Sequence, residues 1–143
     1  MTVAHILAKK GRNVVTTRQE RTLHEVSVEL TRQGIGALVV VDANDNIIGI
    51  ISERDIVAAI GNHGVHILAD AVAQHMTRDP KVASEGDSID SMMDTMTNQR
   101  FRHLPIVDGG RLTGLVSIGD VVKHRIEEIE SERKALRDYI ANA

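Results

Sequence analysis

The chain has 143 residues, no cysteine and a formal net charge of −3 at pH 7. The lack of cysteine excludes disulfides and thiolate chemistry, and the acidic balance argues against binding to a nucleic-acid backbone. Aromatic residues are limited to Phe101 and Tyr139, so no stacking platform for bases is expected and the core must be aliphatic. No apolar run approaches the length of a membrane span and the N-terminus lacks a signal-peptide pattern, so we expect a cytoplasmic protein without a membrane partner.

A short amphipathic helix is expected to precede the first unit, and a short strand and a second helix follow it in chain order. Residues 14–17 are all β-branched, which predicts a strand. Thr22 and Glu25 have the spacing of a capping box, so a helix is expected to begin here and to end at Gly34. The apolar face of this predicted helix consists of Leu23, Val26, Leu30 and Ile35.

A hairpin and a third helix follow. The continuous apolar run 38–41 is typical of a strand covered on both faces. The turn at 42–46 is rich in Asn and Asp and leads into a second apolar run at 47–51, which predicts an antiparallel hairpin. Ser52 is expected to cap the next helix, which we predict to end at Gly61.

The segment after this helix is polar and contains glycine, so residues 61–66 are predicted to be a connector. His63 and His66 are three residues apart, but they lie in this flexible segment and no cysteine supports them. A solvated connector is therefore preferred to a metal site, and no metal is expected. His24 and His124 are predicted to lie on polar helix surfaces.

The second half of the chain repeats the first. The segment Gly-Ile-Ile-Ser-Glu-Arg-Asp-Ile-Val at 49–57 recurs as Gly-Leu-Val-Ser-Ile-Gly-Asp-Val-Val at 114–122, 65 residues later. A repeat of fixed period indicates one supersecondary unit used twice. We therefore predict an α/β fold of two β-α-β-β-α units related by a pseudo-twofold axis. The first unit with its leading helix spans 3–62, the connector 63–70 and the second unit 71–125.

The end of the chain departs from the repeat. Residues 118–142 predict one long amphipathic helix, because apolar residues recur mostly at intervals of three, four or seven with charged residues between them. A domain of this size cannot cover the far end of such a helix. We therefore expect a partner helix from a second subunit in a homodimer. The apolar positions are Val122, Ile126, Ile129, Leu136 and Ile140.

Ser52 and Asp55 stand three residues apart where a buried strand leads into a helix, and Ser117 and Asp120 repeat this arrangement. Two interpretations stay open. The spacing caps a helix, which stabilises it by about 0.5–2 kcal/mol. A helix N-terminus also attracts phosphate, and a nearby carboxylate can accept hydrogen bonds from the two hydroxyls of a ribose.

The duplicated unit, its Gly-aliphatic-aliphatic-Ser-x-x-Asp ending and the strand 102–107 resemble a tandem CBS-domain protein, or Bateman module, over residues 3–125. The resemblance implies regulatory binding of an adenosine compound in clefts between the units: AMP, ADP, ATP, NAD(H) or S-adenosylmethionine. It also implies a free-standing homodimer that senses energy or redox state for an unidentified regulated protein. No phosphate-binding loop or dinucleotide-binding glycine motif occurs, so no enzyme activity, catalytic residue or catalytic cofactor is expected. The alternative is a ligand-free dimerisation scaffold.

Carried over to this sequence, the resemblance implies that Asp55 and Asp120 hold ribose hydroxyls. Ser52 and Ser117 would contact a hydroxyl or a phosphate. The other positions implied to face a ligand are Thr16, Gln19 and Val82, the backbone at Gly36, Ala37, Arg102 and His103, and the phosphate-binding side chains of Arg54, Arg102 and His103.

The two implied clefts differ in charge. The second unit has Arg100, Arg102 and His103 where the first has Gly34, Gly36 and Ala37. Because the units cross over, one cleft is expected to be strongly cationic and the other poor in charge. We therefore expect different occupants, or one occupied and one vacant cleft.

Overall fold

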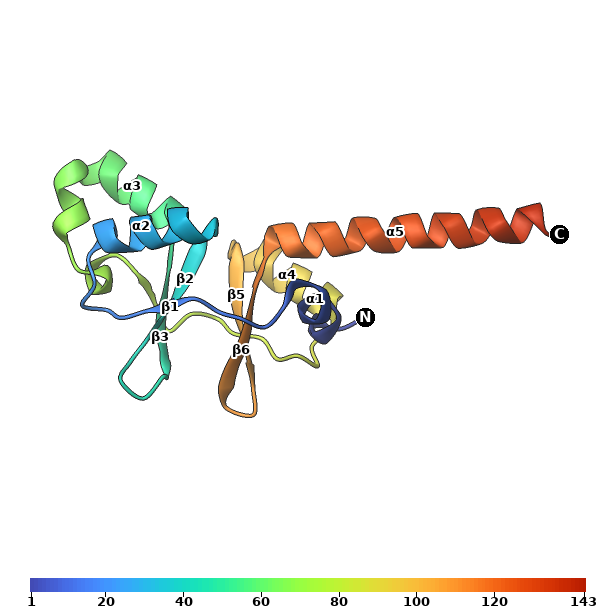
Figure 1. The fold of residues 1–143 in the computed structure, drawn as a ribbon, viewed down its shortest axis with the longest axis horizontal. Coiled ribbons are helices and arrows are strands. Elements are labelled where there is room, and N and C mark those ends of the chain that lie inside the picture. Colours follow the sequence, from blue (N-terminus) through green and yellow to red (C-terminus); the bar gives the residue numbers. More distant parts are fainter.

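The computed structural model describes residues 1–143 and has the mixed α/β fold that the repeat predicts. Two units lie side by side, and a long C-terminal helix extends away from them (Figure 1). The elements of the first half are α1 (Val3–Lys10), β1 (Thr16–Thr17), α2 (Leu23–Gln33), β2 (Ala37–Val41), β3 (Ile47–Ser52) and α3 (Glu53–His63). Those of the second half are the 3-10 turns η1 (Val65–Ala69) and η2 (Val72–Gln74), then β4 (Thr77–Arg78), α4 (Ile89–Gln99), β5 (His103–Asp108), β6 (Arg111–Ser117) and α5 (Ile118–Ala141).

Each unit is built on an antiparallel hairpin. The first sheet has the order β1-β2-β3-β4, with β1 parallel to β2 and the other pairs antiparallel. β4 comes from the second half of the chain, so it extends the sheet of the first unit. The second sheet consists of β5 and β6, and Ala83 forms an isolated parallel bridge with Ile106 where the first unit has β1.

The predicted helix caps are present. Thr22 forms a capping box with Glu25 at the start of α2, and Gly34 ends this helix in the left-handed conformation. β2 is buried along its whole length, as expected for a strand covered on both faces. Met92 and Met96 are buried in the second core, where they act as aliphatic filler.

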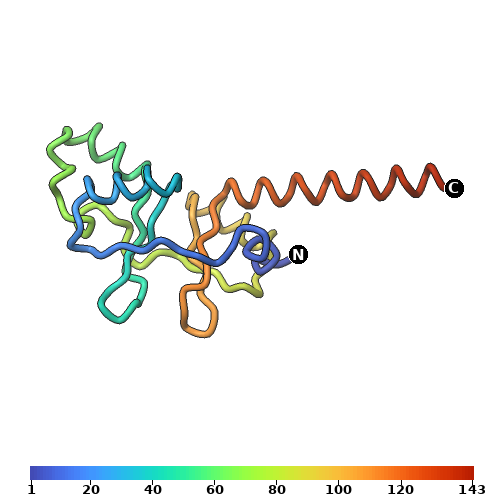
Figure 2. The backbone as a smooth tube through the Cα atoms, viewed as in Figure 1, coloured from blue at the N-terminus to red at the C-terminus, as the bar shows by residue number.

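The units exchange their leading segments. α1 packs against the second unit: Leu7 is in the same core cluster as Leu104 and Val116. The segment that precedes the second unit packs against the first, because Val72 and Met76 belong to its core. The blue N-terminal segment accordingly crosses from one unit to the other (Figure 2).

Two equivalent glycines make this exchange possible. A Cβ atom at Gly114 would lie 2.6 Å from a methyl carbon of Leu7, and one at Gly49 would lie 2.5 Å from the Met76 sulfur and 3.0 Å from the Thr77 carbonyl oxygen. The glycine that opens the repeated motif is therefore required by close packing of the exchanged segment.

Three local predictions were wrong. α3 continues past Gly61 to His63, because its last turn is closed by Gly64 at a φ of 96°. The connector is not simply a solvated loop, since it contains η1, whose Ile67 is buried in the first core. His124 is only 5% exposed, because the face of α5 that carries it packs toward its own unit.

Candidate functional site

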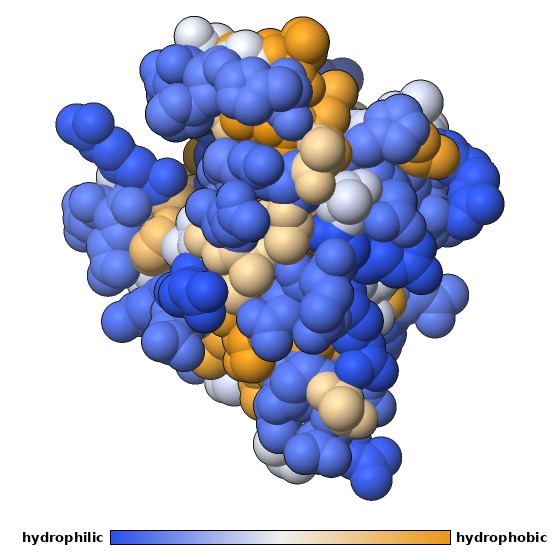
Figure 3. Space-filling view, turned by 90° about the vertical axis from the view of Figure 1, so that its left-hand side faces the viewer, coloured by the Kyte–Doolittle hydropathy of each residue, from blue (hydrophilic) through white to orange (hydrophobic).

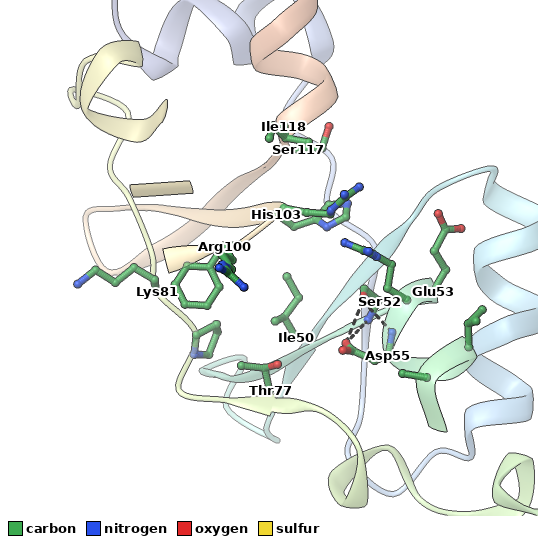
Figure 4. A pocket seen from close by; sticks show the side chains of 16 residues that line it. Ile50, Ser52, Glu53, Asp55, Thr77, Lys81, Arg100, His103, Ser117 and Ile118 are labelled. Atoms are coloured by element: carbon green, nitrogen blue, oxygen red, sulfur yellow. Dashed lines mark hydrogen bonds between the residues drawn. The ribbon is translucent and has the colours of Figure 1, made fainter. Parts of the chain in front are cut away.

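A cleft of about 760 Å³ lies between the two units. The end of β3 and the start of α3 form one wall, and the other is formed by β4 with the segment that follows it, the segment that leads into β5, and the end of β6 (Figure 4). The volume lies within the range of about 300–1,000 Å³ that is usual for small-molecule sites. Of the residues predicted to bind a ligand, this cleft brings together Ser52, Arg54, Asp55, Arg102, His103 and Ser117.

Ser52 and Asp55 form the helix cap that their spacing predicts. The Asp55 Oδ2 atom accepts from the Ser52 backbone N–H at 2.9 Å and from the Ser52 hydroxyl at 3.0 Å. The Asp55 N–H donates to the Ser52 hydroxyl oxygen at 3.2 Å. None of these three bonds uses Asp55 Oδ1, and this oxygen has no partner in the chain. The carboxylate can therefore cap α3 and still accept a hydrogen bond in the cleft.

The cleft carries an excess of positive charge. Arg54 comes from the first unit, and Lys81, Arg100 and Arg102 come from the second. None of these four side chains forms an ion pair within the chain. Their charges therefore remain available to an anionic ligand. The acidic residues that line the cleft are Glu53 and Asp55.

Arg100 is held in an uncommon backbone conformation. It ends α4 at a φ of 59°, close to the φ of 65° that Gly34 adopts at the equivalent end of α2. A residue with a Cβ atom costs about 1–2 kcal/mol more than glycine in this left-handed region. A strained residue is common at binding sites, and here the strain places a guanidinium in the cleft (Figure 4).

His103 lies where the two units meet. A Cβ atom built on Gly36 would be 3.4 Å from its Nε2 atom and 3.6 Å from Glu53 Oε1. Burial lowers the pKa of His103, and the positive charge of Lys10 lowers it further, against a smaller opposing effect of Asp120. The imidazole is therefore neutral at pH 7, where it can accept or donate a hydrogen bond.

The repeated motif of the second unit has a different environment. Ser117 and Asp120 form the same cap: the Ser117 N–H donates to Asp120 Oδ2 at 2.8 Å. The ammonium group of Lys10, at the end of α1, donates to the same Oδ2 atom at 2.6 Å and to the Leu115 carbonyl oxygen at 2.5 Å. The Lys10 ammonium thus pairs with one oxygen of the carboxylate that the resemblance assigns to a second ribose, and it neutralises the carboxylate charge.

The pKa of Asp120 reflects this pairing. Burial is the largest single influence and acts to raise it. The hydrogen bonds from Lys10 and Ser117 and the charge of Lys10 together outweigh burial, so the pKa lies below its ordinary value. Asp120 is ionised at neutral pH, and it lines a cavity of about 140 Å³ between α1 and α5 rather than the large cleft.

The remaining predicted positions do not line the large cleft. Thr16 is exposed on β1, Val82 is 45% exposed just before the bridge to β5, and the Ala37 side chain is buried. Gln19 is half-buried, and its carbonyl oxygen accepts from the Ala73 N–H. Gly36 lines a separate depression of about 490 Å³ beside α2, and its carbonyl oxygen accepts from the Glu53 N–H at 2.9 Å.

Sequence reasoning missed Thr77, Lys81 and Lys10. Thr77 lies in β4, and Lys81 follows Pro80 in the segment that leads into the second unit. Their position just before Val82 was the available signal. Lys10 was missed because its role depends on the exchange of α1 between units. No cluster of three or more potential metal ligands is present, and no helix of the protein combines the length and apolarity needed to cross a bilayer.

The comparison with known proteins agrees with this geometry. The model of the CBS-domain family matches residues 3–62 and 70–127, one match for each unit. The chain therefore belongs to the CBS-domain family and carries two copies of the domain.

Solved structures share the whole fold. The CBS-domain protein ATU1752 from Agrobacterium tumefaciens is 40% identical, with a TM-score of 0.85 over 87% of this chain and 99% of that one. The CBS-domain pair of MJ0100, solved with 5′-methylthioadenosine and S-adenosylmethionine, is 23% identical, with a TM-score of 0.80 over 90% and 98%. PAE2072 from Pyrobaculum aerophilum, solved with AMP, is 24% identical, with a TM-score of 0.74 over 84% and 89%. At these lower identities the likeness shows the fold alone.

Proposed function

We propose that the chain is a non-catalytic regulatory module that binds an adenosine nucleotide, AMP or a relative such as ATP or NAD(H), in the large cleft. One observation carries this proposal: four cationic side chains without an ion pair share a cleft with a carboxylate that has a free oxygen. A nucleotide needs both features, because cations and a helix N-terminus bind phosphate and a carboxylate binds a diol.

Different residues of the cleft contact the ribose, the phosphate and the adenine ring. Asp55 Oδ1 accepts from the ribose hydroxyls, in the way acidic residues bind ribose elsewhere. Arg100 and Arg102 bind the phosphate, since guanidinium groups match its oxygens in pairs. Ile50 and Ile118 line opposite walls and supply apolar contact for the adenine ring (Figure 4).

The charge of the cleft selects among adenosine compounds. The neighbours of the same fold were solved with AMP in one case and with 5′-methylthioadenosine and S-adenosylmethionine in the other. Methylthioadenosine has no phosphate, and S-adenosylmethionine carries a positive sulfonium. A cleft with Arg54, Lys81, Arg100 and Arg102 favours a ligand with at least one phosphate.

We further infer a single nucleotide per chain. Two of the three lysines beside the second motif already pair within the chain, Lys10 with Asp120 and Lys9 with Glu127. The large cleft is lined by both units, so a bound nucleotide bridges them and stabilises one relative arrangement. Through this arrangement, in a homodimer, the module reports energy or redox state to a protein that it regulates.

Calorimetric titration with AMP and adenosine tests the proposal. We expect AMP to bind at one site per chain and at least about tenfold more tightly than adenosine, because a charged phosphate contact is worth about 1.5–3 kcal/mol. Asp55→Asn should weaken AMP binding about thirtyfold. Asp120→Asn is the matched control, because it alters the same type of cap, and it should change the affinity less than about twofold. Equal affinity for AMP and adenosine would contradict phosphate binding, and no binding of either would favour the ligand-free scaffold.

A further inference from the structure

The outer half of α5 is not buried by any other part of the chain. From Ile129 to the C-terminus every residue is exposed, and the helix projects alone from the second unit (Figures 1 and 2). A free helix of this length, about 20 Å, is only marginally stable in water without a partner. The opposite end of the molecule is mostly hydrophilic, with small separate apolar patches (Figure 3).

Helix α5 carries a seam of mostly apolar residues that runs from its first turns through the free part. Starting at Val122, the residues of this seam are separated alternately by four and three positions, which is the spacing of the inward-facing positions of a coiled coil. The apolar members are between 48% and 63% exposed, a large exposure for residues of this size. The seam consists of Val122, Ile126, Ile129, Arg133, Leu136 and Ile140.

We propose that this seam binds the same seam of a second copy of the chain in a parallel two-stranded coiled coil. In that arrangement the residue just before Ile126 and the residue just before Arg133 each face, on the partner helix, the residue five positions further on. Arg125 then faces Glu130 of the second copy, and Glu132 faces Arg137. Both pairs are attractive, and the twofold symmetry makes each of them twice.

Antiparallel pairing over the whole seam is unfavourable. It places Glu130 opposite Glu130, Glu132 opposite Glu132 and Lys123 opposite Arg137, all of like charge. The charge pattern therefore selects the parallel orientation, which also brings the two CBS units of the dimer to the same end of the helix pair.

Arg133 is the one polar residue in the seam. A polar side chain at a single inward-facing position lowers stability but favours two strands in one register. In the parallel register its guanidinium lies beside Glu132 of the second copy, which offsets the repulsion between the two Arg133 residues. Neither Glu132 nor Arg137 forms an ion pair within its own chain, so both are free for these contacts.

The inference rests on the homodimer of the proposed function and adds its orientation. Because the chain has no cysteine, a single introduced cysteine reports on one contact. Leu136→Cys places the two sulfurs at the same level of a parallel seam, within reach of a disulfide. We expect mild oxidation of the full chain to give mostly cross-linked dimer. The matched control Ala135→Cys, one position off the seam, should cross-link at least about fivefold more slowly.

Charge reversal then tests the register. In the Leu136→Cys background, Glu132→Arg and Arg137→Glu should each slow cross-linking about fivefold or more, because two attractive pairs become repulsive. The double variant Glu132→Arg/Arg137→Glu restores the attractive pairs but not the contact of Glu132 with Arg133, so it should cross-link faster than either single variant and more slowly than Leu136→Cys alone. Equal cross-linking at 135 and 136, or no rescue by the double variant, would overturn the parallel coiled coil.

Light scattering separates this failure from failure of the homodimer. A chain that is dimeric without preferential cross-linking at 136 dimerises through another face or in the antiparallel orientation, and the present inference is then wrong. A monomeric chain refutes both the homodimer and the coiled coil, while AMP binding, measured on the same protein, is unaffected by either outcome.

Discussion

Replacement of Lys10 by methionine tests whether the protein closes its own second cleft. Methionine keeps most of the length and apolar character of the lysine stem but removes the ammonium group. That group donates to Asp120 at 2.6 Å and to the Leu115 carbonyl oxygen at 2.5 Å. Its side chain is 38% exposed, so solvent screens the pair and we expect a loss of about 1 kcal/mol in the free energy of unfolding. This corresponds to a decrease in Tm of about 3 °C.

The same change should expose a second ligand site. Asp120 then has no ammonium on Oδ2 and its charge is no longer neutralised, so it should accept more strongly from a ribose, and AMP titration of Lys10→Met should give two sites per chain in place of one. The new site should be the weaker, because Lys81 and the arginines all line the other cleft. Lys9→Met is the matched control: Lys9 is adjacent and pairs with Glu127 at 3.0 Å, but it does not contact Asp120. One site in Lys10→Met, or two sites already in the wild type, would refute the reasoning.

The difference in Tm between the wild type and Lys10→Met should also depend on pH. The folded-state pKa of Asp120 is lowered, so the stability that this carboxylate contributes is present above its unfolded pKa of about 4 and is lost as the pH falls through the lower folded value. The Tm difference between wild type and Lys10→Met should therefore be constant near neutral pH and shrink progressively as the pH falls below about 4.

Three further predictions concern single residues. Arg100→Gly should raise the free energy of unfolding by about 1 kcal/mol, because glycine adopts the φ of 59° without strain. The same change should weaken AMP binding about tenfold, because it removes the guanidinium. A loss of stability in this variant would show that Arg100 is not strained. Gly114→Ala should lower the free energy of unfolding by about 1–3 kcal/mol, since the new methyl group would lie 2.6 Å from Leu7. Gly61→Ala in helix α3, where nothing lies within 4 Å, should raise it by about 0.5–1 kcal/mol. Chemical denaturation measures both changes. The pKa of His103 is lowered by burial, so its stabilising effect is present above the ordinary value of about 6.5 and is lost as the pH falls through the folded value. Tm should therefore fall less between pH 7 and pH 5 in His103→Gln than in the wild type, and identical profiles would show that this histidine does not titrate as described.

The sequence predicted what depends on local spacing. The caps at Thr22, Ser52 and Ser117, both hairpins and the long final helix follow from residues within a few positions of one another, and all are present. The charge difference between the clefts was also predictable, since Arg100 and Arg102 stand where the first unit has glycine. Which motif shares a cleft with these arginines was not predicted, and the structure places them in the cleft that Asp55 lines.

The packing partner of each segment could not be predicted in the same way. The periodicity of α1 shows that Ile6 and Leu7 face a core, but the two hairpins have nearly the same sequence pattern and either could receive them. Long-range packing decides between them, and with it the position of Lys10. For the same reason His124 was placed on a surface, although the side of α5 that carries it is covered by its own unit.

The exchange of leading segments has a consequence for how the protein can be divided. A fragment cut between the two units would lack either α1, needed to fill the core around Leu104, or the stretch with Val72 and Met76, needed to fill the core around Leu38. Neither half is a self-sufficient folding unit, so unfolding should be a single cooperative event and the separate halves should recover native structure only when mixed. Each unit of the repeat is therefore completed by a segment that belongs to the other in sequence.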